Sequence, residues 1–208
     1  MVRSSNTSSL SIGNRPTADP QFKEAGARLK ILYDNLDDAN FPTEGRVLQF
    51  DYYASLQSLG ANAIFRKVEV NFQDNLTIGS NTFSFAARYG RALKDENLSV
   101  FNQYSLGGFL QMSAFRPGEI RGDAVAYGRL SYYRRLGQFS NPFGRSMYAG
   151  VTGEFARSIE FPAKLGDAKT RNSLAAFVGV DTLIGPLYLG YGRTRDRDGI
   201  FYLFLGQP

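Results

Sequence analysis

Few residues of this chain are suited to acid–base or nucleophilic chemistry. The 208 residues include no histidine and no cysteine, which excludes Ser-His-Asp and Cys-His catalysis and any thiolate metal site. A pair of carboxylates is the remaining option, and Asp37-Asp38 is such a pair. The pair lies among turn-forming residues, where Asp side chains ordinarily bind backbone N–H groups. We therefore expect a solvated turn, no catalytic residue, no cofactor and no metal, and a chain that is not an enzyme.

Net charge and hydropathy narrow the class of protein further. The chain carries 24 cationic residues and a formal net charge of +5, but its arginines are spread singly rather than clustered, so we expect no nucleic-acid partner. No apolar run approaches the roughly 20 residues that a membrane helix needs. Residues 1–20 are rich in Ser, Asn, Thr and Pro and do not resemble a signal peptide, so we expect a flexible leader there.

The elements that must position any functional side chain are β-strands. Apolar and polar residues alternate with period two from residue 22 onward; Leu48, Phe50 and Tyr52, for example, alternate with Gln49 and Asp51. Nine segments show this pattern strongly: 25–33, 46–56, 67–72, 83–90, 126–133, 147–155, 173–183, 186–194 and 199–206. A tenth and weaker one lies in 98–113.

The two faces of these segments indicate a membrane barrel. The apolar faces end in Tyr and Phe, as interfacial aromatic girdles do, and the polar faces combine charge, Tyr and Gly, as a lumen does. The alternative is a soluble, lipocalin-like ligand-binding barrel, in which the apolar face would point inward. We predict that Leu48, Phe50, Tyr52, Phe83, Phe85, Leu130, Val151, Leu187 and Leu189 face lipid. We predict that Gln49, Asp51, Arg88, Arg129 and Glu154 face the lumen and form Arg–carboxylate pairs.

Three motifs in order resemble one superfamily. They are the turn Asp34 to Gly45, the pair Leu106-Gly107-Gly108 and Ile120-Arg121-Gly122-Asp123, and the hairpin from Gly185-Pro186 to the last strand. Together they resemble the bacterial surface antigen barrels of outer-membrane insertases and two-partner-secretion transporters. Within that superfamily the chain is most similar to the C-terminal barrels of patatin-like phospholipase autotransporters.

The resemblance implies functional residues. In the family, an Arg-Gly loop folds into the lumen and its Arg meets an inward acid, which here would join Arg121 and Gly122 to Glu154 or Asp181. Asp123 departs from the aromatic that the family has after Arg-Gly, which weakens this match. The simpler alternative is that Arg121-Gly122-Asp123 forms an exposed turn. An adhesive Arg-Gly-Asp motif is disfavoured, because three-residue matches are common by chance. Along the last strand Arg197 is polar, and Gly199, Tyr202 and Phe204 resemble the C-terminal signal read by the barrel assembly machinery; the final residue is Pro208 rather than an aromatic.

The resemblance also implies a location and a function. We expect an all-β antiparallel transmembrane barrel over residues 21–208, in contact with lipid in the outer membrane of a Gram-negative bacterium. Its role would be structural, or the translocation or insertion of another polypeptide. Gly190, Gly192 and Gly206 would weaken strand packing near the seam, or simply relieve curvature.

The number of strands bears on the assembly. We expect eight to ten strands, preferably ten, because single-chain bacterial barrels have even numbers. Closure of a ten-stranded monomer would then require residues 98–113 in the sheet. Otherwise the edges would pair between chains, as in a homodimer. The chain is shorter than the family's usual sixteen strands require, which indicates a fragment, a shortened relative, or one protomer of a larger barrel.

Overall fold

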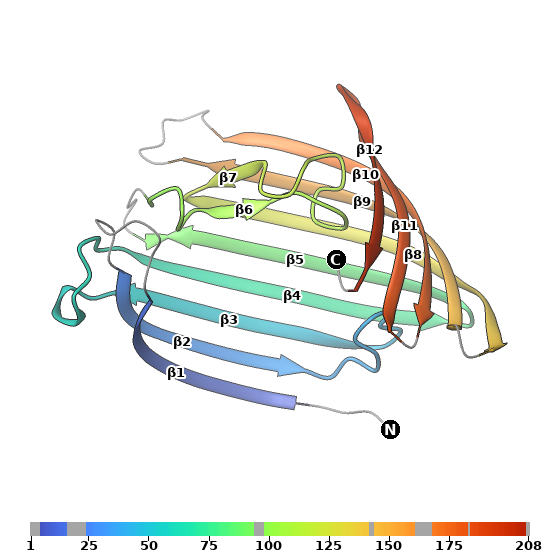
Figure 1. Ribbon diagram of the computed structural model, residues 1–208, viewed down its shortest axis with the longest axis horizontal. Helices are drawn as coiled ribbons and strands as arrows, with labels where there is room; N and C mark the ends of the chain where they lie inside the picture. Colours follow the sequence, from blue (N-terminus) through green and yellow to red (C-terminus); the bar gives the residue numbers. More distant parts are fainter. Residues whose placement is uncertain are drawn as a thin grey trace.

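One strongly curved, ten-stranded antiparallel sheet makes up most of the described structure (Figure 1). The computed structural model describes residues 5–15, 24–93, 98–141, 144–160, 168–182 and 184–206. One 3-10 turn, η1 (Gln57–Leu59), lies in a connection between two strands. Among the described residues, no helix has the length and apolar character needed to span a membrane.

The nine strongly patterned segments all form strands of this sheet. Their bounds are β2 (Glu24–Asp34), β3 (Gly45–Ser55), β4 (Arg66–Ile78), β5 (Asn81–Ala92), β8 (Ala124–Asn141), β9 (Gly144–Ile159), β10 (Lys169–Thr182), β11 (Gly185–Thr194) and β12 (Arg197–Leu205). Each is antiparallel to its neighbours, and the strand order follows the chain. The prediction of an antiparallel all-β fold is therefore confirmed. The sequence could predict it because alternation is a local property of each segment.

The tenth strand is not the one that we predicted from the sequence. It is β1 (Ser5–Arg15), which pairs with β2 along its whole length, from Ser5 opposite Asp34 to Arg15 opposite Glu24. The prediction of a flexible leader over 1–20 is thus wrong for residues 5–15; residues 1–4 and 16–20 lie outside the described residues. A strand can be held by backbone hydrogen bonds to its neighbour without an apolar pattern of its own, so alternation did not reveal this one.

Residues 98–113 do not enter the main sheet. β5 pairs directly with β8, and the segment between them folds over the concave face, where β6 (Tyr104–Leu106) and β7 (Ile120–Gly122) form a separate two-stranded sheet (Figure 1). Four residues of 107–112 have positive φ, which a regular strand does not allow. The predicted closure of a ten-stranded monomer through 98–113 is therefore wrong. No ladder joins β1 to β12 in the part of the chain that the structure describes.

The two ends of the sheet differ in their connections. At one end, which we call the short-turn end, the strands are joined by residues 35–44, 79–80, 142–143 and 183–184. At the other, the long-loop end, the connections include 56–65, 93–123 and 160–168. In outer-membrane barrels the short turns are periplasmic and the long loops extracellular. In a barrel of that kind the long-loop end of this sheet would be the extracellular one.

The phase of the alternation is as predicted. The large apolar side chains lie on the convex face, where Leu130, for example, is 67% exposed, while Asp51 and Glu154 are buried on the concave face. Two concave-face ion pairs form between neighbouring strands: Arg28–Asp51 at 2.6 Å and Arg88 Nε–Glu69 at 3.0 Å. An apolar face directed outward is the opposite of the lipocalin arrangement, which disfavours the soluble alternative. All nine predicted lipid-facing side chains are exposed or half-exposed: Leu48, Phe50, Tyr52, Phe83, Phe85, Leu130, Val151, Leu187 and Leu189.

Candidate functional site

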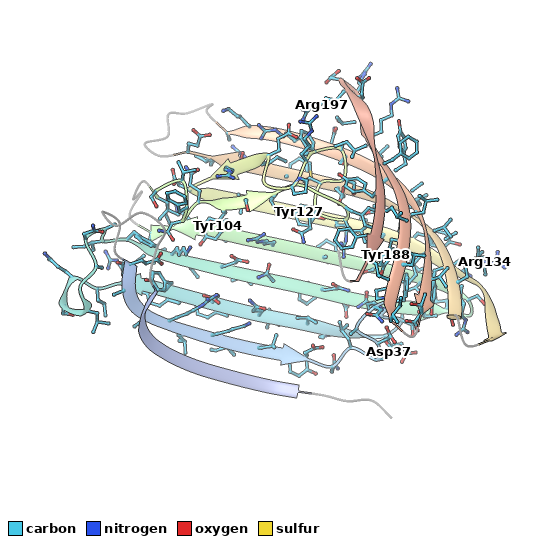
Figure 2. All side chains as sticks on the ribbon, in the orientation of Figure 1. Asp37, Tyr104, Tyr127, Arg134, Tyr188 and Arg197 are labelled. Atoms are coloured by element: carbon cyan, nitrogen blue, oxygen red, sulfur yellow. The ribbon has the colours of Figure 1, made fainter. Side chains whose placement is uncertain are left out.

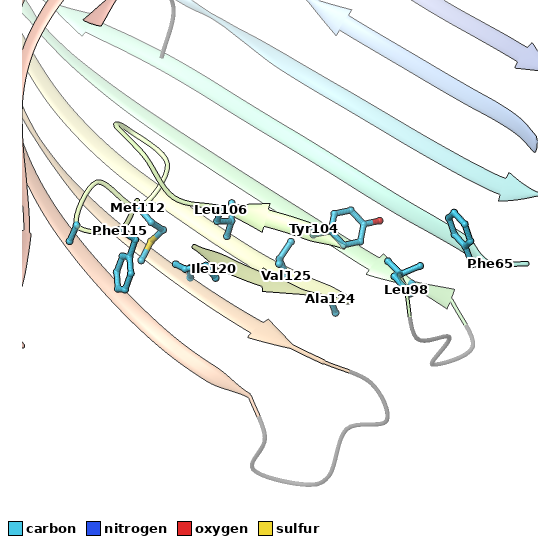
Figure 3. Packing of buried hydrophobic residues seen from close by; sticks show 12 residues of the cluster. Phe65, Leu98, Tyr104, Leu106, Met112, Phe115, Ile120, Ala124 and Val125 are labelled. Carbon is cyan, nitrogen blue, oxygen red and sulfur yellow. The ribbon is translucent and has the colours of Figure 1, made fainter. Parts of the chain in front are cut away.

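Residues 98–123, the inner loop, cover the concave face of β8 and β9. The loop is anchored by side chains of its own two short strands, and Leu106 and Ile120 are among the most deeply buried residues of the protein. They pack with Tyr104, Met112 and Val125 in one apolar cluster (Figure 3). A segment that emerges at the long-loop end is thereby held inside the curve of the sheet.

The tip of the inner loop, residues 107–115, has a strained backbone. Gly107 and Gly108 adopt φ of 127° and 102°, and Leu110 and Met112 adopt φ of 57° and 80°. A Cβ at Gly107 would lie 2.1 Å from Arg116 O, so only glycine fits there. Left-handed backbone at non-glycine residues costs about 1–3 kcal/mol each and persists only where the surroundings hold it. Contacts of the tip with the sheet must supply that support.

The carboxylate of Glu154 is the principal support. It is 4% exposed on β9 and accepts hydrogen bonds from two successive backbone N–H groups of the tip, Met112 N at 3.0 Å and Ser113 N at 2.6 Å. The Tyr127 hydroxyl lies 3.1 Å from Glu154 Oε1 and 2.8 Å from Leu110 O, at the centre of the concave face (Figure 2). Hydrogen bonds to a charged acceptor are about twice as strong as neutral ones. Glu154 is therefore the acid that meets the loop.

The same tip contacts the last three strands. Ala114 N donates to Ser173 Oγ on β10 at 2.8 Å, and Tyr202 on β12 donates its hydroxyl proton to Ser113 O at 2.9 Å. On β11 the backbone itself approaches the tip, because a Cβ at Gly192 would lie 2.1 Å from Ser113 O. The inner loop thus joins β9 to β12, the edge strand, across the concave face.

A second contact region joins the tip to the short-turn end. Phe41, from the turn at residues 35–44, stacks on Tyr148 with ring centroids 4.3 Å apart and also packs on Tyr188. Phe109 of the tip packs on the same Tyr188 ring at 5.5 Å, and the Tyr188 hydroxyl donates to Asn40 O at 2.9 Å. Two segments from opposite ends of the sheet therefore meet through one tyrosine.

The two aspartates singled out from the sequence hold the turn rather than form an active site. Asp37 accepts hydrogen bonds from Thr43 N at 2.8 Å and Glu44 N at 3.0 Å, and from the Thr43 hydroxyl. Asp38 accepts them from the N–H groups of Asn40 and Phe41. Burial of the Asp37 carboxyl raises its pKa, but the hydrogen bonds from Glu44 and Thr43 outweigh burial, so its pKa lies below the ordinary value.

We expect Asp37→Asn to destabilise the turn by about 1 kcal/mol at neutral pH, since charge-assisted hydrogen bonds are replaced by weaker ones. A carboxyl with a lowered folded pKa stabilises the protein above its unfolded pKa, about 3.9. That contribution is lost as the pH falls through the folded pKa. Urea unfolding in detergent micelles at pH 7 and at pH 3 should show a difference between wild type and variant that shrinks at pH 3. Asp198→Asn, at an exposed carboxylate, is the control. A difference that grows at pH 3 would contradict the prediction.

Arg121 does not take the place expected for it. It is exposed, and its Nε donates to Gly118 O at 3.0 Å within its own turn. Gly122 lies in β7 against the backbone of β9, where a Cβ would be 2.7 Å from Ile159 O. Asp123 is fully buried and accepts from Leu98 N at 2.8 Å, so residues 121–123 are neither an exposed turn nor an accessible adhesive motif.

The other predicted residues lie apart from the Glu154 contact. Asp181, the alternative inward acid, accepts a hydrogen bond from Asn40 Nδ2 at 3.3 Å near the short-turn end. On β12, Gly199 makes room for the Tyr191 ring and Phe204 is partly exposed. Tyr202, the third residue of the expected C-terminal signal, belongs to the tip contact.

Met112 and Ser113 were missed from the sequence because they bind Glu154 through their backbone, which no side-chain pattern reports. The sequence nevertheless contained one signal that a segment lies against β11. Gly190 and Gly192 alternate on β11 and make room for the loop, since a Cβ at Gly190 would lie 2.4 Å from the Phe109 ring. Paired glycines on the inward face of a strand indicate close approach of another segment.

Comparison with protein families matches nearly the whole chain. A family model described as the Omp85 superfamily domain matches residues 3–207, which is nearly the whole chain and includes β1. No curated protein matches the chain. The closer resemblance to barrels of patatin-like phospholipase autotransporters stays a prediction.

Proposed function

Since this chain belongs to the Omp85 superfamily, whose members are outer-membrane proteins, we propose that it passes or inserts another polypeptide in the outer membrane of a Gram-negative bacterium. The convex face supports the membrane location. Its exposed apolar side chains pair across neighbouring strands, as Phe85 and Leu130 do across β5 and β8, and the buried Asp51 and Glu154 lie on the opposite face. A surface of this kind is stable in lipid and prone to aggregation in water.

The two edges of the sheet are the main reason to propose that the protein binds another polypeptide. β1 and β12 end the strand order, and in the described residues no strand pairs with their outer edges. Unpaired backbone groups cost several kcal/mol each in hydrocarbon, so these edges bind another strand when the sheet lies in a membrane. That strand comes from a client polypeptide, from further strands of a larger barrel, or from a second copy.

The inner loop is positioned to control the β12 edge. Its tip is fixed to β9 by Glu154 and to β12 by the Tyr202 hydroxyl, which lies 2.9 Å from Ser113 O. A docked tip holds β12 in line with the rest of the sheet, and release of the tip frees the edge to move. No covalent chemistry takes part in this mechanism, which therefore needs no catalytic residue. Assembly machinery would read Gly199, Tyr202 and Phe204 on the same strand as the protein enters the membrane.

A photo-crosslinking residue at Leu203 tests the proposal. Leu203 is 76% exposed on β12, and Leu130 is 67% exposed at the centre of the sheet, so the two positions differ in edge location rather than in exposure. Crosslinks to other polypeptides should form in cells from position 203 and not from position 130. Equal crosslinking from both positions would contradict the proposal. Crosslinks from 203 only to a second copy, with a native mass of twice the chain, would assign the edge to a homodimer instead.

A further inference from the structure

Two glycines on the convex face have no neighbour within the protein that explains them. Gly128 on β8 has no atom within 4 Å of an added Cβ, and Gly153 on β9 has only Leu174 Cδ2, at 3.7 Å. Neither has a positive φ, and both lie in regular ladder register away from the irregularities of the β8–β9 pair. At the inward Gly150, by contrast, an added Cβ would lie 2.6 Å from the Phe177 ring. Glycine weakens a strand and usually marks a bulge, a tight bend or a point of close approach. The regular register at Gly128 and Gly153 excludes a bulge, which leaves room on this face for a group from outside the chain.

The missing side chains open a groove of 1110 Å³ across the convex face. One cross-strand row through it runs from Phe85 to Leu130, Gly153, Leu174 and Arg193. The walls are large apolar side chains, and the floor is glycine. The volume suffices for a hydrocarbon chain, since pockets of about 300–1,000 Å³ hold drug-sized ligands.

One end of the groove is polar and cationic. Arg193 and Arg195 line it beside Thr194, whose hydroxyl donates to Asn172 Oδ1 at 3.0 Å. The Glu154 carboxylate belongs to the same stretch of sheet but points to the opposite face, where it binds the loop tip. The cationic end lies at the β11–β12 turn, which is at the long-loop end and hence in the extracellular leaflet. An apolar trough that ends in two guanidinium groups fits an acyl chain attached to a phosphate.

We infer that this groove binds a phosphate-bearing, multi-acyl lipid of the outer leaflet, with one acyl chain over Gly128 and Gly153 and a phosphate at Arg193 and Arg195. The inference rests on the proposed outer-membrane location. It also accounts for the position of the arginine pair, because guanidinium groups bind phosphate through two parallel hydrogen bonds. Phosphatidylethanolamine would also fill the groove, but it carries an ammonium group beside its phosphate, which the two arginines repel.

Native mass spectrometry of the detergent-solubilised full chain tests the inference, with lipid A and phosphatidylethanolamine as separate probes. We expect wild type to retain lipid A in preference to phosphatidylethanolamine. The double variant Gly128→Val, Gly153→Val should lose that preference, because the new side chains fill the groove without a clash. Gly137→Val is the control: Gly137 also has nothing within 4 Å of an added Cβ, but it lies outside the groove, at the register shift of the β8–β9 pair that accounts for a glycine there. Heat-dependent mobility on an unboiled gel reports whether each variant folds.

A second pair of variants tests the phosphate site without filling the groove. Arg193→Ala with Arg195→Ala should lower lipid A occupancy about tenfold, in line with loss of charge-assisted hydrogen bonds. Arg134 is an exposed arginine of β8 that lies outside the groove, toward the short-turn end (Figure 2). Arg134→Ala should therefore leave lipid A occupancy unchanged. Equal retention of both probes by wild type, or unchanged occupancy in both sets of variants, would overturn the inference while leaving the proposed function intact. Failure of wild type to insert into vesicles would overturn both.

Discussion

Glu154→Ala is expected to lower the free energy of unfolding by about 3 kcal/mol and to release the inner loop. The substitution leaves the N–H groups of Met112 and Ser113 without an acceptor in a buried site, and each unsatisfied group costs about 1–3 kcal/mol. The strained backbone at Leu110 and Met112 also loses its support. Glu154→Gln keeps one acceptor oxygen, so its effect should be intermediate.

Urea unfolding in detergent micelles measures the loss of stability, and chymotrypsin reports the loop. Phe109 and Phe115 are buried in the docked tip and should become cleavable in the Ala variant. Glu160→Ala is the control, because that carboxylate is 64% exposed and pairs with Lys169 at 3.8 Å. Removal of such a surface pair changes stability by less than about 1 kcal/mol. An Ala variant that resists chymotrypsin as wild type does would show that the tip does not depend on Glu154.

Leu48→Arg is expected to destabilise the membrane-inserted protein by about 2–4 kcal/mol, with the upper end applying at mid-bilayer depth. Leu48 is exposed on the convex face of β3, so a guanidinium there would lie in hydrocarbon. The measurement is unfolding by guanidinium chloride in phospholipid vesicles, followed by circular dichroism rather than by tryptophan fluorescence. The chain has no tryptophan.

Gln49→Arg is the matched control for Leu48→Arg. Gln49 is the next residue of β3 and points to the concave face, near Asn71 in the pairing register. An arginine there stays in the polar interior, and we expect less than half the cost of Leu48→Arg. A larger cost at position 49 than at position 48 would mean that the two faces had been assigned the wrong way round.

The sequence by itself determined the strands and their faces. Segments such as 46–56 and 83–90 alternate strictly, and period-two alternation is fixed by the geometry of a single strand, whatever its neighbours. The same local pattern placed Leu48 outward and Asp51 inward before any pairing was known. Three motifs in order then indicated the superfamily, and Glu154 was among the acids expected to meet a loop in the lumen.

Only the tertiary structure decided which segment supplies the tenth strand and what Glu154 binds. β1 has only Leu10 and Ile12 in apolar alternation, too short a pattern to predict a strand, and its backbone pairing with β2 holds it in the sheet. Residues 98–113 alternate well, yet the positive φ at Gly107, Gly108, Leu110 and Met112 turns them into a loop. Glu154 binds backbone N–H groups of Met112 and Ser113 rather than Arg121, and every residue type except proline carries such a donor. Side-chain identity therefore could not specify that contact, and only the folding of the loop onto β9 brings donor and acceptor together.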